Sequence, residues 1–189
     1  MRIIAGARKG LRLHVPAGRS VRPTSDRARE GLMSALGGFF DGEAVLDLCA
    51  GSGAMSLELL SRGCGHAVLV EHDRQAAACI IENTARAAMG DRVRLLQSDV
   101  LKALTGLRRQ GEKFHLVIFD PPYDGDLYTS VLGALEDGAL LHAGAEVVVE
   151  SKTGLRPEEA GPAWSHGPRH RYGRTTLERL YLAAPEPSP

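Results

Sequence analysis

The sequence predicts a doubly wound α/β fold with a mostly parallel sheet. From residue 44 onward, short and nearly continuous apolar runs alternate with helical stretches. Such runs are typical of strands that are buried on both faces, and their alternation with helices is typical of parallel βαβ units. A basic, glycine-containing segment precedes residue 44 and does not share this pattern. We therefore expect one α/β domain with a small N-terminal extension.

The extension, residues 1–40, is predicted to form a β-hairpin followed by a helix. Residues 2–4 and 11–15 are short apolar runs on either side of the basic turn GARKG, which favours a hairpin. Thr24 or Ser25 can cap a helix that runs to about residue 36, where two glycines follow. These elements come before the repeating α/β pattern, so they are expected to add to the domain rather than to continue its sheet.

The α/β domain is predicted over residues 41–184. Its last apolar run begins with alternating polar and apolar residues, so it could close the sheet as an antiparallel edge strand. The proline-rich tail 185–189 is expected to be disordered. The expected strands are 44–49, 67–71, 93–97, 114–120, 145–150 and 177–183, and the expected helices are 55–62, 74–89, 101–110 and 127–135.

Composition excludes several protein classes. Hydrophobic residues make up 43% and charged residues 24% of the 189 residues, as in an ordinary globular protein. No apolar run approaches the roughly 20 residues that a bilayer needs, and no signal peptide is recognised, so a cytoplasmic protein is expected. Cys49, Cys64 and Cys79 are odd in number and form no CxxC pair, and the seven histidines lack metal-ligand spacing. Neither a disulfide framework nor a metal site is expected.

Charge is unevenly distributed although the net charge is zero. Residues 1–30 contain eight Lys and Arg against two Asp and Glu, a net charge of +6. Residues 31–150 carry a net charge of −8, from nine basic and seventeen acidic residues, and the rest carries +2, from six and four. The basic N-terminal arm is either a phosphate-contacting surface or a solvated charged face. The arm alone favours neither reading.

A glycine-containing loop follows the first predicted strand of the domain. In Asp47–Gly53, DLCAGSG, the glycines let the backbone turn tightly and approach a ligand without Cβ hindrance. The alternatives are a plain strand-to-helix turn and a dinucleotide loop in which Ser56 replaces the third glycine. The loop predicts a cofactor that contains a nucleoside, because ligands of such sheets bind at the carboxyl ends of the strands.

Acidic residues end the next two predicted strands. Glu71 lies 20 residues after Gly51, where its carboxylate can accept hydrogen bonds from both hydroxyls of a ribose. Asp73 is expected to cap the following helix instead. Asp99 can accept a hydrogen bond from an adenine amino group, and capping the helix that follows it is an equally good explanation.

The segment Asp120-Pro121-Pro122-Tyr123 follows the most apolar predicted strand and is the most specific motif in the chain. Two prolines stiffen the backbone and remove its donors, which leaves the Asp120 carboxylate and the Pro121 carbonyl as acceptors. Such acceptors can hold an exocyclic amine and aim its nitrogen, and Tyr123 can stack on a planar base. The alternative is a stiff turn with a satisfied aspartate.

Together these motifs resemble the class I S-adenosylmethionine-dependent methyltransferases. DLCAGSG resembles their first motif, and DPPY resembles the signature of those that methylate amino nitrogens. RIIAG near the N-terminus, RPT at 22–24, LSRG at 60–63 and RYG at 171–173 resemble the RsmD family, and the match runs nearly end to end. Two positions depart from that family's pattern, since Ala5 stands where it usually has Gly and Cys49 where it usually has Phe.

The resemblance implies a seven-stranded, Rossmann-like fold and a monomeric enzyme that methylates N2 of one guanine, guanine 966, in bacterial 16S rRNA of the small ribosomal subunit. It places the methionine part of S-adenosylmethionine on Asp47–Gly53, the ribose on Glu71 and the adenine near Asp99. The residues that it implies for the cofactor are Asp47, Cys49, Ala50, Gly51, Ser52, Gly53, Glu71, Asp99 and Thr24; for the target guanine, Asp120, Pro121 and Tyr123; for the RNA, Arg8, Lys9, Arg12, Arg22 and Arg27.

Other functions compatible with the sequence are a DNA amino-methyltransferase, a protein-glutamine methyltransferase and a catalytically silent RNA-binding module. The DNA enzymes usually need a separate target-recognition segment, for which the chain has little room. The glutamine enzymes have Asn in place of Asp120, and an intact DPPY argues against a silent module. A dehydrogenase explains neither DPPY nor the basic arm. Cys49 is not expected to act as a nucleophile, because amino methylation requires none.

Overall fold

The structure is a computed structural model that describes residues 1–16, 26–121, 125–152, 155 and 160–183. Its helices are α1 (Asp26–Ala35), α2 (Ala54–Ser61), α3 (Arg74–Arg86), the 3-10 helix η1 (Gly90–Arg92), α4 (Val100–Arg109) and α5 (Gly125–Leu135). Its strands are β1 (Ala44–Leu48), β2 (His66–Glu71), β3 (Val93–Gln97), β4 (Phe114–Phe119), β5 (Leu141–Ser151), β6 (Trp164–Tyr172) and β7 (Thr175–Leu182).

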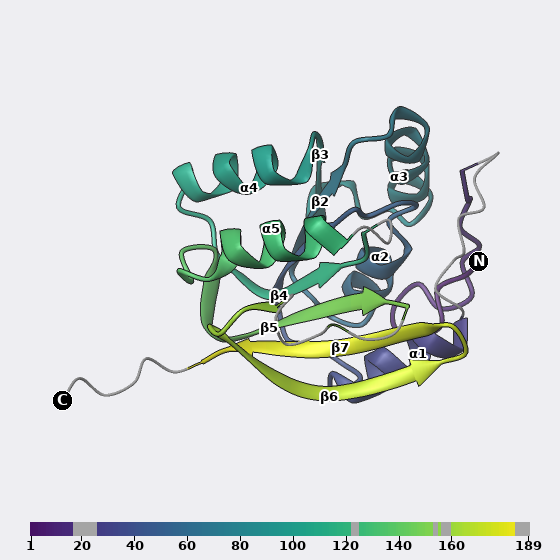
Figure 1. Ribbon diagram of the computed structural model, residues 1–189. Coiled ribbons are helices and arrows are strands. Elements are labelled where there is room, and N and C mark those ends of the chain that lie inside the picture. Colours follow the sequence, from purple (N-terminus) through teal and green to yellow (C-terminus); the bar gives the residue numbers. More distant parts are fainter. Residues whose placement is uncertain (17–25, 122–124, 153–154, 156–159, 184–189) are drawn as a thin grey trace.

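A single seven-stranded sheet runs through the molecule in the order β3-β2-β1-β4-β5-β7-β6 (Figure 1). The first five strands of the chain are parallel to one another, whereas β7 is antiparallel to both of its neighbours. The prediction of a doubly wound, mostly parallel sheet is therefore confirmed. The switch point of the strand order lies between β1 and β4, and the carboxyl ends of these two strands are where such folds bind ligands.

The end of the sheet differs from the sequence-based expectation. The last predicted strand is antiparallel, as expected, but it lies inside the sheet as β7, and the edge strand is β6, which the apolar pattern did not predict. Only Trp164 of β6 is buried, and the pairing with β7 is interrupted between His166 and Arg169, around Gly167 and Pro168. Polar residues, a proline and a bulge are typical of exposed edge strands, which lack the apolar run of a buried strand.

Two apolar cores cover the two faces of the sheet. Because successive residues of a strand point to opposite faces, Leu46 and Leu48 of β1 pack with α4 and α5, whereas Val45 packs with α1, α2 and α3. The second core also contains Ile3 and Leu13 of the N-terminal hairpin, both nearly inaccessible to solvent. The extension therefore shares a core with the α/β domain.

The N-terminal hairpin is looser than predicted. Its two arms are joined by a single bridge between Arg2 and Arg12, with hydrogen bonds from the Ile3 N–H to the Leu11 carbonyl and from the Gly10 N–H to the Ile3 carbonyl. The short arms thus form no regular strands. Most of the order of the hairpin must come from what it packs against, because an isolated two-stranded hairpin is marginally stable in water.

Buried polar side chains of α2 and α3 hold this hairpin in place. The fully buried Glu58 carboxylate accepts hydrogen bonds from the Ile4 and Ala5 N–H groups, at 2.7 and 3.1 Å. The Asn83 side chain accepts from the His14 N–H at 2.7 Å and donates to the His14 carbonyl at 3.0 Å. The hairpin approaches α2 so closely that a Cβ at Gly6 would clash with the Ser61 carbonyl, and Gly6 also has a φ of +81°.

The α1 helix packs against β6 with equally little space. A Cβ at Gly31 would clash with the hydroxyl and ring of Tyr172, at the end of β6. At the end of α1, the Ala35 carbonyl accepts a hydrogen bond from the Arg179 guanidinium of β7. This guanidinium also pairs with Glu146 of β5 at 2.7 Å. These contacts fix α1 across the last strands of the sheet, beside the carboxyl end of β5.

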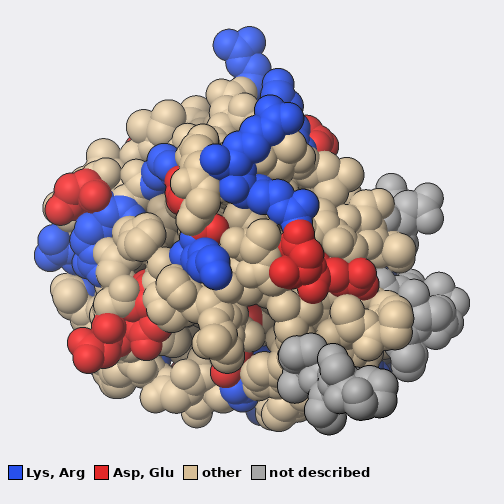
Figure 2. All heavy atoms as spheres, turned by 90° about the vertical axis from the view of Figure 1, so that its left-hand side faces the viewer, with Lys and Arg blue, Asp and Glu red and all other residues tan. Residues whose placement is uncertain are grey.

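The side of the molecule at which β4 and β5 begin carries intermixed charges (Figure 2). Arg94 pairs with Glu112 at 2.6 Å, and Arg108 pairs with Asp137. Basic and acidic groups therefore neutralise each other locally on this side. None of the helices in the described part of the chain combines the length and apolar character that crossing a membrane requires.

Candidate functional site

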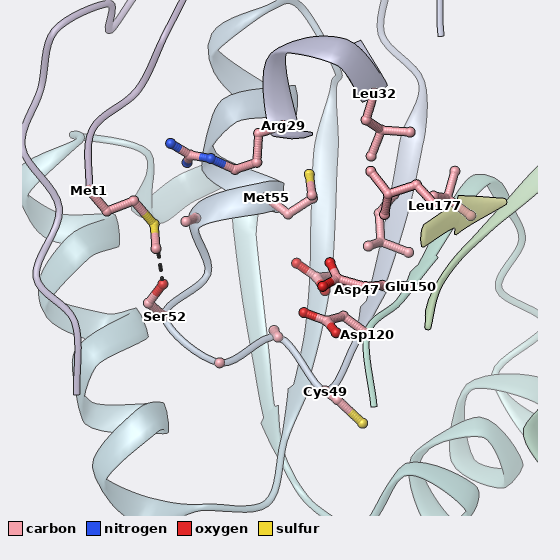
Figure 3. Close-up of a pocket in the computed structure, with 15 residues that line it drawn as sticks. Met1, Arg29, Leu32, Asp47, Cys49, Ser52, Met55, Asp120, Glu150 and Leu177 are labelled. Atoms are coloured by element: carbon pink, nitrogen blue, oxygen red, sulfur yellow. Dashed lines mark hydrogen bonds between the residues drawn. The ribbon is translucent and has the colours of Figure 1, made fainter. Parts of the chain in front are cut away.

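Three carboxylates gather where β1, β4 and β5 end. Asp47 lies beside Ile118 of β4, and Phe119 lies beside Val149 of β5, so Asp120 and Glu150 follow at the same level. Alternation along the strands sends all three side chains to the face covered by α1 and α2. Figure 3 shows the three carboxylates pointing toward one another.

These carboxylates line a pocket between the sheet, the loop after β1 and the extension (Figure 3). The Met1 and Ser52 side chains meet at one side of the pocket, with the sulfur and hydroxyl 3.9 Å apart. Leu32 of α1 and Leu177 of β7 provide apolar wall on the other side. The remaining lining residues are Arg29, Cys49, Ala50, Gly51, Ala54, Met55, Ile118 and Val148.

The loop after β1 adopts a backbone that depends on its glycines. Cys49, Gly51 and Gly53 have φ values of 64°, 58° and 74°, in the left-handed region. A Cβ added at Gly51 would contact nothing within 4 Å, so open space lies beside this residue. The Gly53 N–H donates to the Ala50 carbonyl at 2.8 Å, which closes the turn before α2. The structure thus brings all the predicted loop residues to one wall of the pocket or its immediate support.

Asp47 is 2% exposed and lies at the floor of the pocket. The Ser56 hydroxyl donates a hydrogen bond to its carboxylate at 2.6 Å. Burial raises the pKa of Asp47 from 3.8 to about 7, although the hydrogen bonds of Ser56 favour the ionised form, and the nearby Glu71 raises the pKa further. Ser56, which stands where a dinucleotide loop has its third glycine, therefore has a role of its own.

Asp120 directly follows β4 and faces the same pocket. Burial raises its pKa well above 3.8, and the negative charges of Glu150 and Asp47 raise it further. The next residue, Pro121, is buried. Tyr123, the third predicted residue of this motif, lies outside the described residues. The motif therefore places an acidic acceptor in the pocket, as the sequence predicts.

Glu150 is a pocket residue that sequence reasoning missed. Its side chain is 5% exposed, and its carboxylate accepts a hydrogen bond from the Thr175 hydroxyl at 3.3 Å. Its backbone carbonyl accepts from the Tyr128 hydroxyl of α5 at 2.9 Å. The signal was available, because Glu150 ends a predicted apolar strand in the same manner as Glu71 and Asp120.

Arg29 is the second residue that was missed. It is 1% exposed, lines the pocket from α1 and donates to the Arg2 carbonyl at 2.7 Å. An arginine in an amphipathic helix gives no sign of burial in the sequence. Its position depends on how α1 docks, which the sequence pattern does not specify.

A second pocket adjoins the first at Cys49 and lies between the ends of β2 and β3. It is lined by Cys49, Val70, His72, Ser98, Asp99, Val100 and Leu127. Glu71, beside it, is buried, and its carboxylate accepts from the Gly51 N–H at 2.9 Å and from the Asp73 N–H at 2.8 Å. Glu71 is thus connected directly to the loop that lines the first pocket.

The helix caps predicted at Asp73 and Asp99 are present, whereas the cap predicted at Thr24 or Ser25 lies outside the described residues. Asp73 accepts from the Gln75 and Ala76 N–H groups at the start of α3. Asp99 accepts from the Leu101 and Lys102 N–H groups at the start of α4, and both bonds end on the same oxygen. Capping by Asp99 is therefore confirmed, and the residue also lines the second pocket, where its predicted contact with an adenine would be made.

Cys49 lies between the two pockets, but its thiol points away from the three carboxylates (Figure 3). Burial and the surrounding negative charges raise the pKa of Cys49 to about 12. A thiol with this pKa is a poor nucleophile near neutral pH, since the thiolate is the reactive form. The environment agrees with the prediction that Cys49 is not nucleophilic. Within the ranges given above, no group of three or more His, Cys, Asp or Glu residues could hold a metal ion.

The predicted RNA-contacting residues that the structure describes are not among those that line the first pocket, namely Arg8, Lys9, Arg12 and Arg27. Arg8 and Lys9 are exposed at the tip of the hairpin, where the Arg8 guanidinium donates to the Ala87 carbonyl at the end of α3. Since α2 and α3 both run away from the carboxyl edge of the sheet, this tip lies toward the opposite edge. Arg12 and Arg27 are exposed, and Arg22 and Thr24 lie outside the described residues.

Comparisons with known proteins agree with this geometry. The family model described as Conserved hypothetical protein 95 matches residues 1–181. Ribosomal RNA small subunit methyltransferase D of Escherichia coli strain K12 is 37% identical over 152 residues, which cover 80% of this chain and 75% of that protein.

Solved structures extend the similarity over nearly the whole chain. The structure of yhhF from Escherichia coli is 32% identical, with a TM-score of 0.84 over 98% of this chain and 99% of that one. A hypothetical protein of Thermus thermophilus is 34% identical, with a TM-score of 0.79 over 95% and 98% of the two chains. The chain therefore belongs to the Conserved hypothetical protein 95 family, which is the RsmD family, and has the fold of the class I methyltransferases.

Proposed function

We propose that this protein transfers a methyl group from S-adenosylmethionine to N2 of a guanine in 16S rRNA of the small ribosomal subunit. The family resemblance points to guanine 966. The similarity to ribosomal RNA small subunit methyltransferase D supports an rRNA substrate. The observation that carries the proposal is the position of Asp120, in one pocket with the loop Asp47–Gly53.

The acidic groups of the pocket suit the positively charged S-adenosylmethionine. When bound, this cofactor supplies an electrophilic methyl group on a cationic sulfonium. The open space beside Gly51 accommodates a ligand close to the backbone, and a cation would offset the burial of the Asp47 carboxylate, which belongs to the loop assigned to the cofactor. We assign the methionine part to the loop Asp47–Gly53, the ribose to Glu71 and the adenine to the second pocket beside Asp99. We also assign Thr24 to the cofactor, on the basis of the family resemblance alone.

Asp120 and Pro121 are proposed to hold the target amine. The lone pair of an aromatic amine is delocalised into the ring, so the nitrogen is weakly nucleophilic. Two acceptors that bind its N–H groups fix the direction of the lone pair and stabilise the positive charge that develops on the nitrogen during attack. Tyr123 is proposed to stack on the base, which requires a flipped or unpaired guanine. Release of the proton follows transfer, and an ionised Asp120 is the nearest proposed acceptor.

The RNA backbone is proposed to contact the basic residues of the extension, Arg8, Lys9, Arg12, Arg22 and Arg27. The hairpin tip contacts the ends of α2 and α3, whereas the pocket lies where α2 begins, so an RNA that contacts both would have to extend along these helices. An assembled small subunit offers a larger and more rigid surface than a short RNA. We therefore propose the particle as the preferred substrate.

Transfer of label from radioactive S-adenosylmethionine tests the proposal. The acceptors are small ribosomal subunits, naked 16S rRNA and genomic DNA, all lacking the modification. We expect label on 16S rRNA, mapped to a guanine N2. Label on DNA alone would replace the substrate and make the protein a DNA amino-methyltransferase. Cofactor binding without any transfer would instead favour a silent RNA-binding module.

A further inference from the structure

Glu150 occupies a place next to the proposed amine site that the transfer reaction itself does not explain. It lies near the end of β5, one residue after Val149, just as Asp120 comes one residue after the paired Phe119 of β4, so the two carboxylates lie on neighbouring strands and on the same face. Neighbouring strands are about 4.8 Å apart, and the two carboxylates point toward each other (Figure 3), so both can face the same edge of one base. The structure therefore places a second acceptor beside the one that is proposed to hold the amine.

The three bases with an exocyclic amine differ in what lies beside it. In adenine and cytosine, the adjacent ring nitrogen has a lone pair and accepts hydrogen bonds. In guanine, two ring nitrogens flank N2, and the one on the Watson–Crick edge, N1, carries a hydrogen and donates. A carboxylate next to the amine site would bind the N1–H of guanine and would repel the lone pair of adenine or cytosine.

We propose that Glu150 is the specificity-determining residue of the pocket and accepts a hydrogen bond from guanine N1–H while Asp120 and Pro121 hold the N2 amine. This inference rests on the proposed function. It assigns the choice of guanine to a residue outside the DPPY motif, which by itself fits the amine of any base.

The surroundings of Glu150 suit this role. Thr175 donates to its carboxylate, and Tyr128 fixes its backbone carbonyl, so both ends of the residue are oriented by neighbouring elements. The carboxylate is buried but lines the pocket, where a hydrogen bond from a ligand is not weakened by competition with water. Its negative charge is among the causes that raise the pKa of Asp120, as expected for two carboxylates that face each other in one pocket.

The test varies both the base at the methylated position and the side chain at position 150. Full-length 16S rRNA is prepared by ligation with guanine, 2-aminopurine or 2,6-diaminopurine at the methylated position, and is supplied free and in reconstituted small subunits. Both analogues keep the 2-amino group, but their N1 accepts instead of donating. Wild type and Glu150→Gln are compared, because the glutamine amide can donate to N1. Glu146→Gln is the matched control, since Glu146 lies on the same strand and face but pairs with Arg179 outside the pocket.

We expect the wild-type kcat/KM to be about 5- to 150-fold higher for guanine than for 2,6-diaminopurine, since a base contact of this kind discriminates by about 1–3 kcal/mol. Glu150→Gln should lose or invert this preference, while Glu146→Gln keeps it. Loss of the 6-oxygen in the analogues affects all variants alike, so the change in preference reports on N1. A residue that only supports the fold would lower all rates and leave the ratio unchanged.

Two results would overturn the inference alone, namely equal wild-type rates on guanine and the analogues, or an unchanged preference in Glu150→Gln. The first needs no variant, so it applies even if the substitution prevents folding. Thermal unfolding and equilibrium binding of S-adenosylhomocysteine verify that each variant is folded. Wild-type protein that leaves guanine unmethylated in every rRNA substrate would overturn the proposed function, and this inference with it.

Discussion

Replacing Asp47 by Asn should change how stability depends on pH. Burial raises the pKa of Asp47 from its ordinary value of 3.8 to about 7, so between these values the folded protein holds a proton that the unfolded chain has released. The free energy of unfolding therefore falls as pH rises from about 4 to 7 and levels off above. At 1.36 kcal/mol for each pH unit, the raised pKa of Asp47 lowers the free energy of unfolding by about 4 kcal/mol at pH 8 and by about 1.5 kcal/mol at pH 5, relative to strongly acidic pH.

Asparagine carries no charge but keeps an oxygen that can accept the hydrogen bond from Ser56. The difference in unfolding free energy between Asp47→Asn and wild type should therefore shift in favour of the variant by roughly 2.5 kcal/mol between pH 5 and pH 8. Urea unfolding of the cofactor-free protein at both pH values measures this difference. A constant effect of the new side chain cancels in the comparison.

The exposed Asp91 provides a control, because Asp91→Asn removes a carboxylate that is not buried. Its pH profile should follow that of wild type. Parallel profiles for Asp47→Asn and wild type would refute the reasoning, since they would mean that ionising Asp47 costs the folded protein nothing.

Three further outcomes are expected. Asp120→Ala should lower the rate of methyl transfer by about 100-fold or more, because the amine loses its orientation. The affinity for S-adenosylmethionine, measured by calorimetry, should stay nearly unchanged. An equal loss of rate and affinity would mean that Asp120 belongs to the cofactor site instead. Gly31→Ala should lower the unfolding free energy by about 1–3 kcal/mol in wild type, because the new Cβ meets the Tyr172 side chain. In a Tyr172→Ala background the same substitution should cost much less. Equal effects in both backgrounds would exclude the clash. Alanine substitution of the three hairpin cations Arg8, Lys9 and Arg12 should weaken RNA binding. It should also reduce the slope of log affinity against log salt concentration by up to about 2. An unchanged slope would exclude the hairpin from the RNA interface.

The sequence predicts the interior of this fold well, because its parallel strands are short apolar runs. The bounds of β1 to β4 agree with the expected ranges to within one residue at each end. The β6 strand was missed because only its first residue, Trp164, is buried, so its sequence carries no apolar run. The pairing of the hairpin was overestimated, since its apolar residues Ile3 and Leu13 pack against α2 and α3 rather than supporting a ladder.

The candidate site was predictable where its residues follow apolar strands. Glu71 and Asp120 were found in this way, and Glu150 could have been found by the same rule. The burial of Arg29 could not, because it depends on the docking of α1 against β6 and β7, which local sequence does not encode. The perturbed pKa values of Asp47 and Asp120 likewise arise from distances between strands that are far apart along the chain.

The docking of the hairpin has a consequence for the order of events during synthesis. The His14 N–H finds its partner on Asn83, which is made 69 residues later. At about 5–20 residues per second, the hairpin waits roughly 3–14 s with Ile3 and Leu13 unburied. The wait is longer for the pocket, since β7 fills the position between β5 and β6 and brings Leu177 to its wall. A nascent chain that ends before β7 should therefore expose apolar surface to chaperones and lack one wall of the pocket.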